Sequence, residues 1–274
     1  MTAVPRTGTW SAAILILFAA VTVLPILGVV LLSLQPPETQ LSGFEWPDRL
    51  HFENYARAFE VAHFASYLQS SLIVSIAVVV GTVVVSTLSG YAFGTMRFPG
   101  ENVLFYLLLT GLVIPFEAVI VPLYVELRAG HLTNSYWSVI LPLIGTNSAF
   151  GTFWMRAYFR AVPRQLLEAA AMDGAGSMRI LWKVLLPGAR PALLTLVVLV
   201  FMWSWNEFLL PLVMLSREDL RTAPLGLAFF AGRYTTDLVG MAAAAVMVAL
   251  PVAVLFIATH RRFVHGMWVG ALKQ

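Results

Sequence analysis

The side chains that could do chemistry in this sequence are few, and their spacing does not form a catalytic site. There is no cysteine, which excludes thiolate catalysis and iron–sulfur ligation. The sequence also lacks a G-x-S-x-G stretch, an acid pair suited to hydrolysis and a G-x-x-x-x-G-K-[ST] phosphate loop. The five histidines are scattered, and none stands at metal-ligand spacing from another. We therefore expect no catalytic residue, no metal ligand and no cofactor in this chain.

Polar side chains do occur within strongly apolar stretches, at Glu117 and at Trp205-Asn206-Glu207. At bilayer depth an ionisable side chain costs about 2.5–3.5 kcal/mol on insertion scales, so it usually faces a cavity or a partner. Neighbouring residues point to different helix faces, so Asn206 and Glu207 cannot both point along one pore. Two interpretations stay open: these two residues line a solute route, or they bond to unwound backbone or a partner helix. Glu117 follows Pro115, which favours capping of a backbone group or a place near the outer interface.

The composition indicates a bilayer as the solvent of this chain. Of its 274 residues, 59% are hydrophobic and 11% are charged, whereas a soluble domain carries about 25% charged residues. A membrane-crossing helix needs about 20 mainly apolar residues, and six stretches qualify. Backbone polar groups have no water partner in lipid, so the expected fold is all-α, a polytopic membrane protein with one transmembrane domain over residues 1–274. The six expected spans are 11–34, 72–94, 103–123, 136–154, 192–214 and 239–259.

The lysines and arginines predict the orientation. With the N-terminus in the cytoplasm, eleven of the 17 basic residues fall in inside segments and six in outside loops. This excess favours both termini inside. The inside residues include Arg6, Arg97 and Lys273, and the outside residues include Arg217 and Arg233. The excess of basic over acidic residues is therefore explained by membrane topology, and we expect no nucleic-acid partner.

The inside loop 155–191 predicts a short helix–turn–helix beneath the bilayer. Pro163 suits the first turn of a helix, and residues 165–172 are good helix formers. Gly174 and Gly176 permit a sharp turn, after which Ser177 can cap a second helix. That helix should carry one apolar stripe, and Pro187 should end it or begin a bend back to the membrane. The stripe consists of Met178, Leu181, Trp182 and Leu185.

This loop resembles a known family motif. Residues 168–174, Glu-Ala-Ala-Ala-Met-Asp-Gly, with Val-Leu-Leu-Pro at 184–187, are similar to the EAA loop, EAA-x3-G-x9-I-x-LP, of permease subunits in binding-protein-dependent type I ABC importers. The resemblance extends over nearly the whole chain and is closest to the maltose-type second permease subunit of the carbohydrate-uptake family. Its further matches are Asn54-Tyr55, Ser70-Ser71-Leu72 (where Ser70 replaces the usual Asn), Ile114–Glu117, Trp205–Phe208, Arg262–Gly266 and Gly270–Lys273.

The resemblance implies a coupling helix between helices 4 and 5 that inserts into a cleft on a cytoplasmic ATPase subunit. Glu168 would meet a basic residue there, and Gly174 would let the turn enter closely. Closure of two ATPase subunits around ATP would then switch the membrane helices between inward-facing and outward-facing states. The implied coupling residues are Glu168, Ala169, Ala170, Asp173, Gly174, Ala175 and Pro187.

The resemblance also implies partners, a solute class and a location. The partners are a related second permease subunit, two ATPase subunits that bind ATP and Mg, and an extracytoplasmic solute-binding protein. The solute would be a sugar or sugar-like compound. Its route would use Glu117, Trp205, Asn206 and Glu207, because amides and carboxylates bond hydroxyls and aromatic faces suit the C–H side of a sugar ring. The location would be a bacterial or archaeal cytoplasmic (inner) membrane, and the chain would not be an enzyme by itself.

Three alternatives compete with this interpretation. An ion-coupled secondary transporter of a small polar solute would favour repeats and paired broken helices, which the sequence does not predict. An intramembrane hydrolase would need a nucleophile–base pair, and no histidine lies in an expected span. The loop could also be an amphipathic helix resting on lipid, but this would leave its glycines and its Leu-Pro unexplained.

Overall fold

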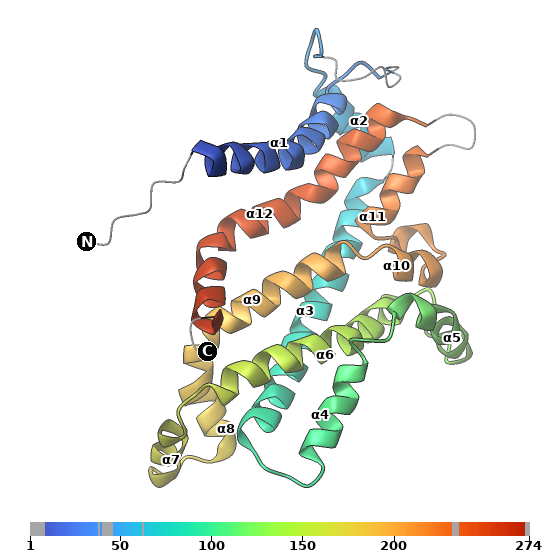
Figure 1. Cartoon of the computed structure of the whole chain (residues 1–274). Coiled ribbons are helices and arrows are strands. Elements are labelled where there is room, and N and C mark those ends of the chain that lie inside the picture. The colour runs from blue at the N-terminus through green and yellow to red at the C-terminus, as the bar shows by residue number, and fades with distance from the viewer. Residues whose placement is uncertain (1–8, 38, 40–45, 62, 232–235, 272–274) are drawn as a thin grey trace. The chain divides into compact units, whose positions relative to one another are not determined.

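The computed structural model describes residues 9–37, 39, 46–61, 63–231 and 236–271, which are helical with short connections (Figure 1). The all-α prediction is confirmed within these residues, where the β pairing is limited to an isolated bridge between Ala231 and Thr236. Arg6, Arg233 and Lys273, which the orientation argument uses, lie outside the described residues.

Four helical segments in the described part of the chain are long and apolar enough to cross a membrane. The first coincides with α1, whose side chains are almost all exposed, as expected for a helix that is apolar all round and meets lipid. The third combines α8, the π turn after it and α9 into one continuous helix. The four segments are Trp10–Leu32, Phe64–Thr95, Ser177–Trp205 and Leu238–Thr259.

The chain divides into two compact units, residues 1–65 with 226–250 and residues 66–225 with 251–274. Two long helices, α3 and α12, each contribute to both units. The prediction of one transmembrane domain stays a prediction. The helices are α1 (Thr9–Leu32), α2 (Glu53–Val61), α3 (Phe64–Thr95), α4 (Glu101–Thr110), α5 (Phe116–Ala129), α6 (Trp137–Arg160), α7 (Arg164–Met172), α8 (Ser177–Ile180), α9 (Leu186–Trp205), α10 (Leu209–Met214), α11 (Ala223–Gly226) and α12 (Leu238–Ala271).

In the first unit, α2 holds the end of α1. The buried Asn54 donates its side-chain amide to the carbonyls of Ser33 at 3.0 Å and Gln35 at 2.8 Å, just past the last turn of α1. These carbonyls lack intrahelical partners, so the amide serves as a side-chain cap. The neighbouring Tyr55 hydroxyl lies 2.6 Å from Ser33 Oγ. The Asn-Tyr pair at 54–55 therefore has a structural explanation, independent of any partner.

The start of α12 in the same unit is also capped. Asp237 Oδ1 accepts a hydrogen bond from the Gly240 backbone N–H at 2.8 Å, as an N-cap residue does. Its other carboxylate oxygen lies 2.9 Å from Arg57 Nη2 on α2. This partly exposed ion pair connects two segments that are 180 residues apart in sequence.

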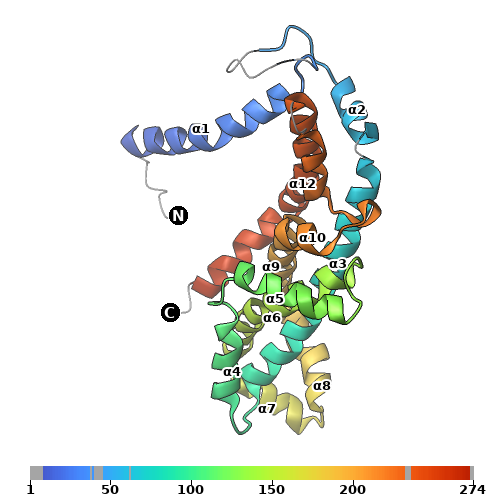
Figure 2. The same ribbon diagram turned by 90° about the vertical axis from the view of Figure 1, so that its right-hand side faces the viewer.

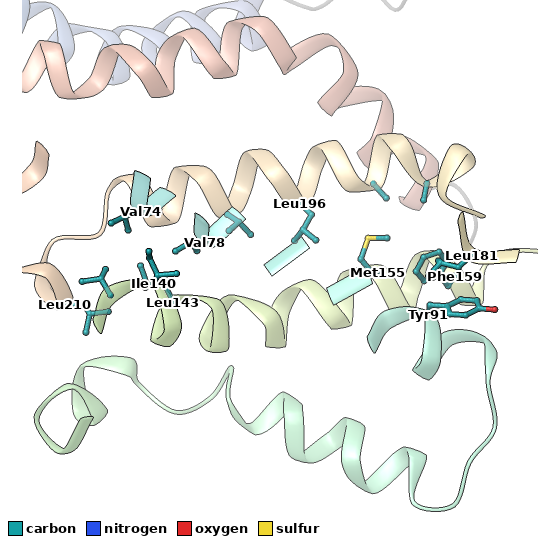
Figure 3. Packing of buried hydrophobic residues seen from close by; sticks show 14 of the residues in the cluster. Val74, Val78, Tyr91, Ile140, Leu143, Met155, Phe159, Leu181, Leu196 and Leu210 are labelled. Carbon is teal, nitrogen blue, oxygen red and sulfur yellow. The ribbon is translucent and has the colours of Figure 1, made fainter. Parts of the chain in front are cut away.

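In the second unit, α6 and α9 run side by side and contribute nine of the 19 described residues in the core cluster (Figures 1 and 2). Figure 3 shows the buried apolar side chains that fill the space between α3, α6 and α9. α5 and α10 pack at the end of the unit where α6 begins, and α7 and α8 lie where α6 ends (Figure 1). This arrangement places the loop 163–185 and the helix breaks described below at opposite ends of one core.

Glycines allow α3 to approach α6 closely. A Cβ at Gly90 would lie 2.6 Å from Met155 Cβ and 3.0 Å from the backbone N of Arg156, so even alanine would force the helices apart. A Cβ at Gly94 would lie 2.8 Å from Phe159 Cβ. The close contact fixes the position of α3 against the end of α6.

The expected third span, 103–123, is not one continuous helix. α4 ends at Thr110, and α5 begins at Phe116 after an extended Pro115 with φ −64° and ψ 120°. Pro115 cannot donate a backbone hydrogen bond and disfavours a helical conformation in the residue before it. The helix is therefore broken at this proline.

The expected fifth span, 192–214, is also divided, because α9 ends at Trp205 and α10 begins at Leu209. Two other boundaries moved: α3 begins at Phe64, eight residues before the expected start at residue 72, and α6 continues to Arg160. Two broken helices, which the sequence did not predict, are therefore present, so the expected lack of such breaks no longer argues against a secondary transporter.

Candidate functional site

The loop 163–187 folds as expected in its first half. α7 follows Pro163, which stands at its N-cap, and the helix ends at Met172. The Gly174 N–H then donates to the Ala171 carbonyl and the Ala175 N–H to the Ala170 carbonyl, both at 3.0 Å. With φ +74° at Gly174, this is a Schellman motif with glycine at the C′ position. The spacing of Ala170, Ala171 and Gly174 in the motif is therefore the spacing that this type of helix C-terminus requires.

The two faces of α7 differ in what they contact. Ala170 and Ala175 are partly buried and pack against the core cluster. Glu168, Ala169 and Asp173 are exposed, and the Glu168 carboxylate has no hydrogen bond or ion pair with a described residue. Beside them lies the apolar side chain of Met172, 87% exposed. The tip thus presents small and apolar groups around two carboxylates, those of Glu168 and Asp173, which have no partner among the described residues.

The second half of the loop corrects three expectations. Ser177 does not cap α8, because Gly176 stands at the N-cap and no side chain bonds there. The apolar stripe is divided, since Leu181 and Leu185 are buried whereas Met178 and Trp182 are exposed. Pro187 does not end the helix. The Leu186 N–H bonds to the Leu181 carbonyl, five residues back, in a π turn over Leu181–Leu185.

The π turn explains how the helix continues through Pro187. In an α-helix the ring of Pro187 would clash with the carbonyl of Lys183, four residues earlier, and would leave that carbonyl without a donor. A π turn is wider than an α-helical turn and often marks a functional segment. The helix therefore runs without interruption from Ser177, next to the turn, to Trp205.

The break after α9 holds three of the predicted route residues. Asn206 is exposed and donates its side-chain amide to the Met202 carbonyl at 2.8 Å, at the end of α9. Glu207 is half-buried, and its Oε1 accepts the Leu210 N–H at 3.0 Å, at the start of α10. Trp205 is buried and stacks on Phe201 with ring centroids 5.4 Å apart. The two polar residues thus bond to backbone groups at the ends of α9 and α10, and their role in a solute route stays a prediction.

Glu117 lies in the first turn of α5, directly after the other break, and is exposed. A carboxylate is favourable near a helix N-terminus, whose partial charge is positive. α5 contacts α10, so both breaks belong to the same end of the second unit. The structure therefore brings the segments of Glu117 and Glu207 near each other, although their side chains share no hydrogen bond in the described residues.

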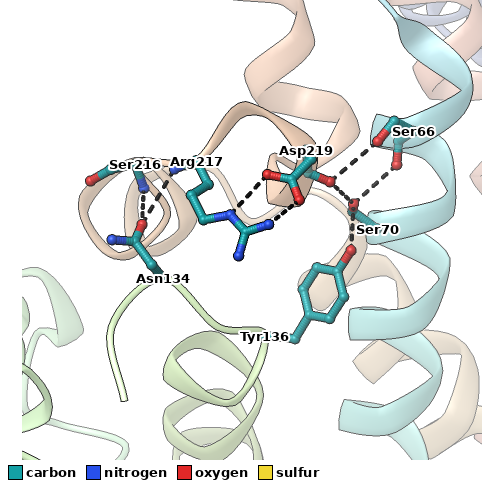
Figure 4. A network of polar contacts seen from close by, with 7 residues as sticks. All are labelled: Ser66, Ser70, Asn134, Tyr136, Ser216, Arg217 and Asp219. Atoms are coloured by element: carbon teal, nitrogen blue, oxygen red, sulfur yellow. Dashed lines mark hydrogen bonds and ion pairs between the residues drawn. The ribbon is translucent and has the colours of Figure 1, made fainter. Parts of the chain in front are cut away.

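A polar network that the sequence analysis missed lies at this end of the unit (Figure 4). Asn134, in the left-handed conformation with φ 55°, accepts the Ser216 N–H at its Oδ1 at 2.7 Å. Ser70 Oγ lies 2.9 Å from the Tyr136 hydroxyl and 3.4 Å from the Asp219 carbonyl, and Arg217 pairs with the Asp219 carboxylate. The signals available in the sequence were Asn134, a residue type that tolerates positive φ, and the Arg-Glu-Asp run at 217–219.

No cluster of three or more histidine, aspartate or glutamate side chains in the described residues could hold a metal ion. Among the titratable groups at the two ends of the unit, Glu207 bonds to the start of a helix and Arg217 pairs with Asp219, whereas Glu168 and Asp173 have no partner among the described residues. The chemistry this arrangement offers is recognition by hydrogen bonds and apolar contact.

Comparison with known proteins identifies the family. Residues 86–268 match the family described as binding-protein-dependent transport system inner membrane component. The chain is 35% identical to the arabinooligosaccharides transport system permease protein AraQ of Halalkalibacterium halodurans, covering 93% of this chain and 92% of the relative. It is 31% identical to the diacetylchitobiose uptake system permease protein NgcG of Streptomyces coelicolor (96% and 88% covered) and 32% identical to the trehalose transport system permease protein SugB of Mycobacterium tuberculosis (98% and 98%).

Solved structures agree at the level of the fold. A chain of a bacterial ABC transporter involved in the import of the acidic polysaccharide alginate superposes with a TM-score of 0.81 at 24% identity, covering 96% of this chain and all of that one. A second structure, of a bacterial alginate ABC transporter in complex with a periplasmic protein, gives a TM-score of 0.69 at 14% identity over 93% and 95% of the two chains. The family match covers more than half of the chain and includes both the loop and the break after α9, so the protein belongs to the inner membrane components of binding-protein-dependent transport systems.

Proposed function

We propose that this chain is one of two permease subunits of an ATP-driven importer for a sugar or sugar-like solute. The relatives named for arabinooligosaccharides, diacetylchitobiose and trehalose support the solute class. An extracytoplasmic binding protein delivers the solute, and two separate ATPase subunits, which bind ATP and Mg, hydrolyse the nucleotide. The chain itself is not an enzyme. The complex lies in a bacterial or archaeal cytoplasmic membrane.

In this proposal the chain crosses the membrane six times with both termini inside. The spans are α1, α3, the α4–α5 pair, α6, the α9–α10 pair and α12. Each divided span is long enough when its two helices are taken together. The exposed residues at the breaks, among them Ile114, Asn206 and Phe208, are then covered by the sibling subunit or line a water-filled route, as irregular backbone at membrane depth requires. The loop 163–185 then lies in the cytoplasm, and the network in Figure 4 lies on the outer side.

The observation that carries the proposal is the exposed tip of α7. Glu168, Ala169 and Asp173 face outward, Gly174 closes the helix in a left-handed turn, and Ala170 and Ala175 hold the motif on the core. Small residues let another protein surface approach closely, and an unpaired carboxylate can accept a hydrogen bond from a cation on that surface. Asn206, Glu207, Trp205 and Glu117 form the candidate solute route near the outer side.

The test is reconstitution of this permease with its sibling subunit, ATPase subunits and binding protein in proteoliposomes. Uptake of labelled trehalose and of labelled arabino- and chito-oligosaccharides is measured with MgATP inside the vesicles. We expect uptake of at least one sugar that requires ATP hydrolysis and persists when a protonophore collapses the proton gradient. Uptake that stops with the protonophore while ATP is held constant would favour an ion-coupled transporter instead.

A further inference from the structure

The second half of the loop is tied to a membrane helix by a buried tyrosine outside the motif. Tyr91 lies on α3 and is 5% exposed. Its hydroxyl lies 3.0 Å from Ser177 Oγ and donates to the Ser177 carbonyl at 3.1 Å. Ser177 is the first residue of α8, three residues after Gly174. A side chain of α3 therefore reaches the segment that directly follows the α7 tip.

The same tyrosine also contacts α6. Its ring packs edge-on against Phe159, with centroids 5.9 Å apart and planes at 77°. Phe159 is fully buried, and in Figure 3 it lies with Tyr91, Met155 and Leu181 at one end of the core. The ring thus fits between α3 and α6 while its hydroxyl reaches α8. The three elements meet at one side chain.

Tyr91 lies where α3 is held tightly against α6. Gly90 and Gly94, next to it on α3, leave no room for a Cβ against α6. Arg156, one helical turn before Arg160 on α6, donates its Nε to the Phe93 carbonyl of α3 at 3.0 Å. α3 and α6 are therefore locked together around Tyr91. The loop is joined to this locked pair by residues 161–163 after α6 and by the core contacts of Ala170 and Ala175, whereas its second half reaches α3 through the hydrogen bonds of Ser177.

We propose that Tyr91 is the positioning residue that makes the loop 163–185 move as one body with α3 and α6. This inference rests on the proposed function, because a displacement of the tip is supplied by a bound ATPase subunit. Apolar contacts of Leu181 and Leu185 resist separation but permit sliding, since they are not directional. Two directed hydrogen bonds to Ser177 fix the register of α8 against α3. Without them the tip moves and α3 does not follow.

Tyr91→Phe removes the hydroxyl and keeps the ring on Phe159. Ser177→Ala removes one of the two bonding groups and leaves the carbonyl, so its effect should be smaller and of the same kind. Tyr106→Phe is the matched control, because Tyr106 on α4 is exposed and its hydroxyl makes no hydrogen bond to a described residue. The double variant Tyr91→Phe/Ser177→Ala should behave as Tyr91→Phe alone, since Ser177 acts through the tyrosine hydroxyl.

The experiment uses the assembled complex with its ATPase subunits. The chain contains no cysteine, so spin labels can be attached at Met172→Cys on the tip and Arg97→Cys just after α3, both exposed positions. The distance between the labels is measured by pulsed electron spin resonance, without nucleotide and after trapping with MgATP and vanadate. In the otherwise native chain and in Tyr106→Phe, we expect one narrow distance that trapping leaves unchanged.

In Tyr91→Phe we expect the distance to shift and broaden on trapping, with a smaller shift in Ser177→Ala. Hydrogen exchange at the start of α8 should be about fivefold faster without nucleotide, as for the loss of one ordinary hydrogen bond.

The proposal is overturned if Tyr91→Phe matches the native chain after trapping, or if the native distance itself changes. Failure of both variants to assemble, while Tyr106→Phe assembles, would also overturn it, since the hydroxyl would then serve folding. A native chain that binds no ATPase subunit contradicts the proposed function instead.

Discussion

The tip of α7 and the break after α9 both carry an acid in a family motif, but the two acids are used differently. Glu207 accepts a hydrogen bond from the Leu210 N–H, and its neighbour Asn206 donates to the Met202 carbonyl. Glu168 has no such partner among the described residues, although it lies on a short helix whose other face is packed. The acid at the break thus has a partner within the chain, whereas Glu168 at the tip has none among the described residues, and we propose that another protein surface supplies it. Variants at the tip should therefore affect assembly, and variants at the break should affect local stability or transport.

The largest expected effect is that of Gly174→Asp at the tip. The substitution adds a third carboxylate, beside Glu168 and Asp173, where the partner approaches. The left-handed backbone contributes less, because aspartate, like asparagine, adopts positive φ more readily than other side chains. We expect the ATPase subunits to be lost when the permease is purified from mild detergent. Co-purification measures this directly.

Two control variants separate the effect of the backbone conformation at Gly174 from the effect of the added charge. Gly174→Asn keeps a residue type that tolerates positive φ and adds no charge, so it should retain most of the ATPase. Gly176→Asp adds the same charge two residues away, where φ is −68° and a Cβ would meet nothing within 4 Å. If the Gly174→Asp permease still co-purifies with a normal amount of ATPase, the claim that the tip, unlike the break, serves assembly is wrong.

Glu168→Gln should weaken ATPase binding by about tenfold, the size of a hydrogen bond to a charged group. Since no described residue pairs with Glu168, the variant should leave the melting temperature of the isolated permease unchanged. The measurement is ATPase affinity by titration, with thermal unfolding of the permease alone as the control. A lowered melting temperature with unchanged affinity would show that Glu168 serves the fold.

Asn206→Ala should change the uptake rate or the solute preference more than it changes assembly. The amide of Asn206 is exposed, and its single described bond is to a carbonyl at the end of α9, so its remaining hydrogen-bonding capacity is available to a hydroxyl. Initial rates of uptake for a panel of sugars provide the measurement. An unchanged rate and preference would reject a role in the solute route.

Glu207→Ala should give the smallest effect, a loss of about 1 kcal/mol of stability through the missing cap of α10. Glu207→Gln keeps an acceptor oxygen and should recover most of that loss. Urea or thermal unfolding of the purified permease measures both. A change in solute preference in Glu207→Gln, with stability intact, would place this residue in the route as well.

Local signals made the first half of the loop predictable. Pro163, the helix formers after it and Gly174 each act through the backbone of their own segment, and the Schellman motif follows from them. The tyrosine that holds the loop was not predictable, because Tyr91 and Ser177 are 86 residues apart in sequence.

The helix breaks and the passage through Pro187 depend on packing. A proline in an apolar stretch permits a kink, a break or a widened turn, and the neighbours decide among them. Pro115 gives a break, whereas Pro187 sits in a continuous helix because the π turn before it makes room. The apolar stripe failed for the same reason, since the wider turn changes which residues share a face.

The central claim is that the tip of α7 is covered by another protein in the working complex. A single cysteine at Met172, in a chain that otherwise has none, reports on this through its rate of reaction with a membrane-impermeant maleimide. The account predicts rapid labelling in the permease alone and strong protection when the ATPase subunits are bound, with and without nucleotide. Equal labelling of the free and assembled permease throughout the ATP cycle would contradict it.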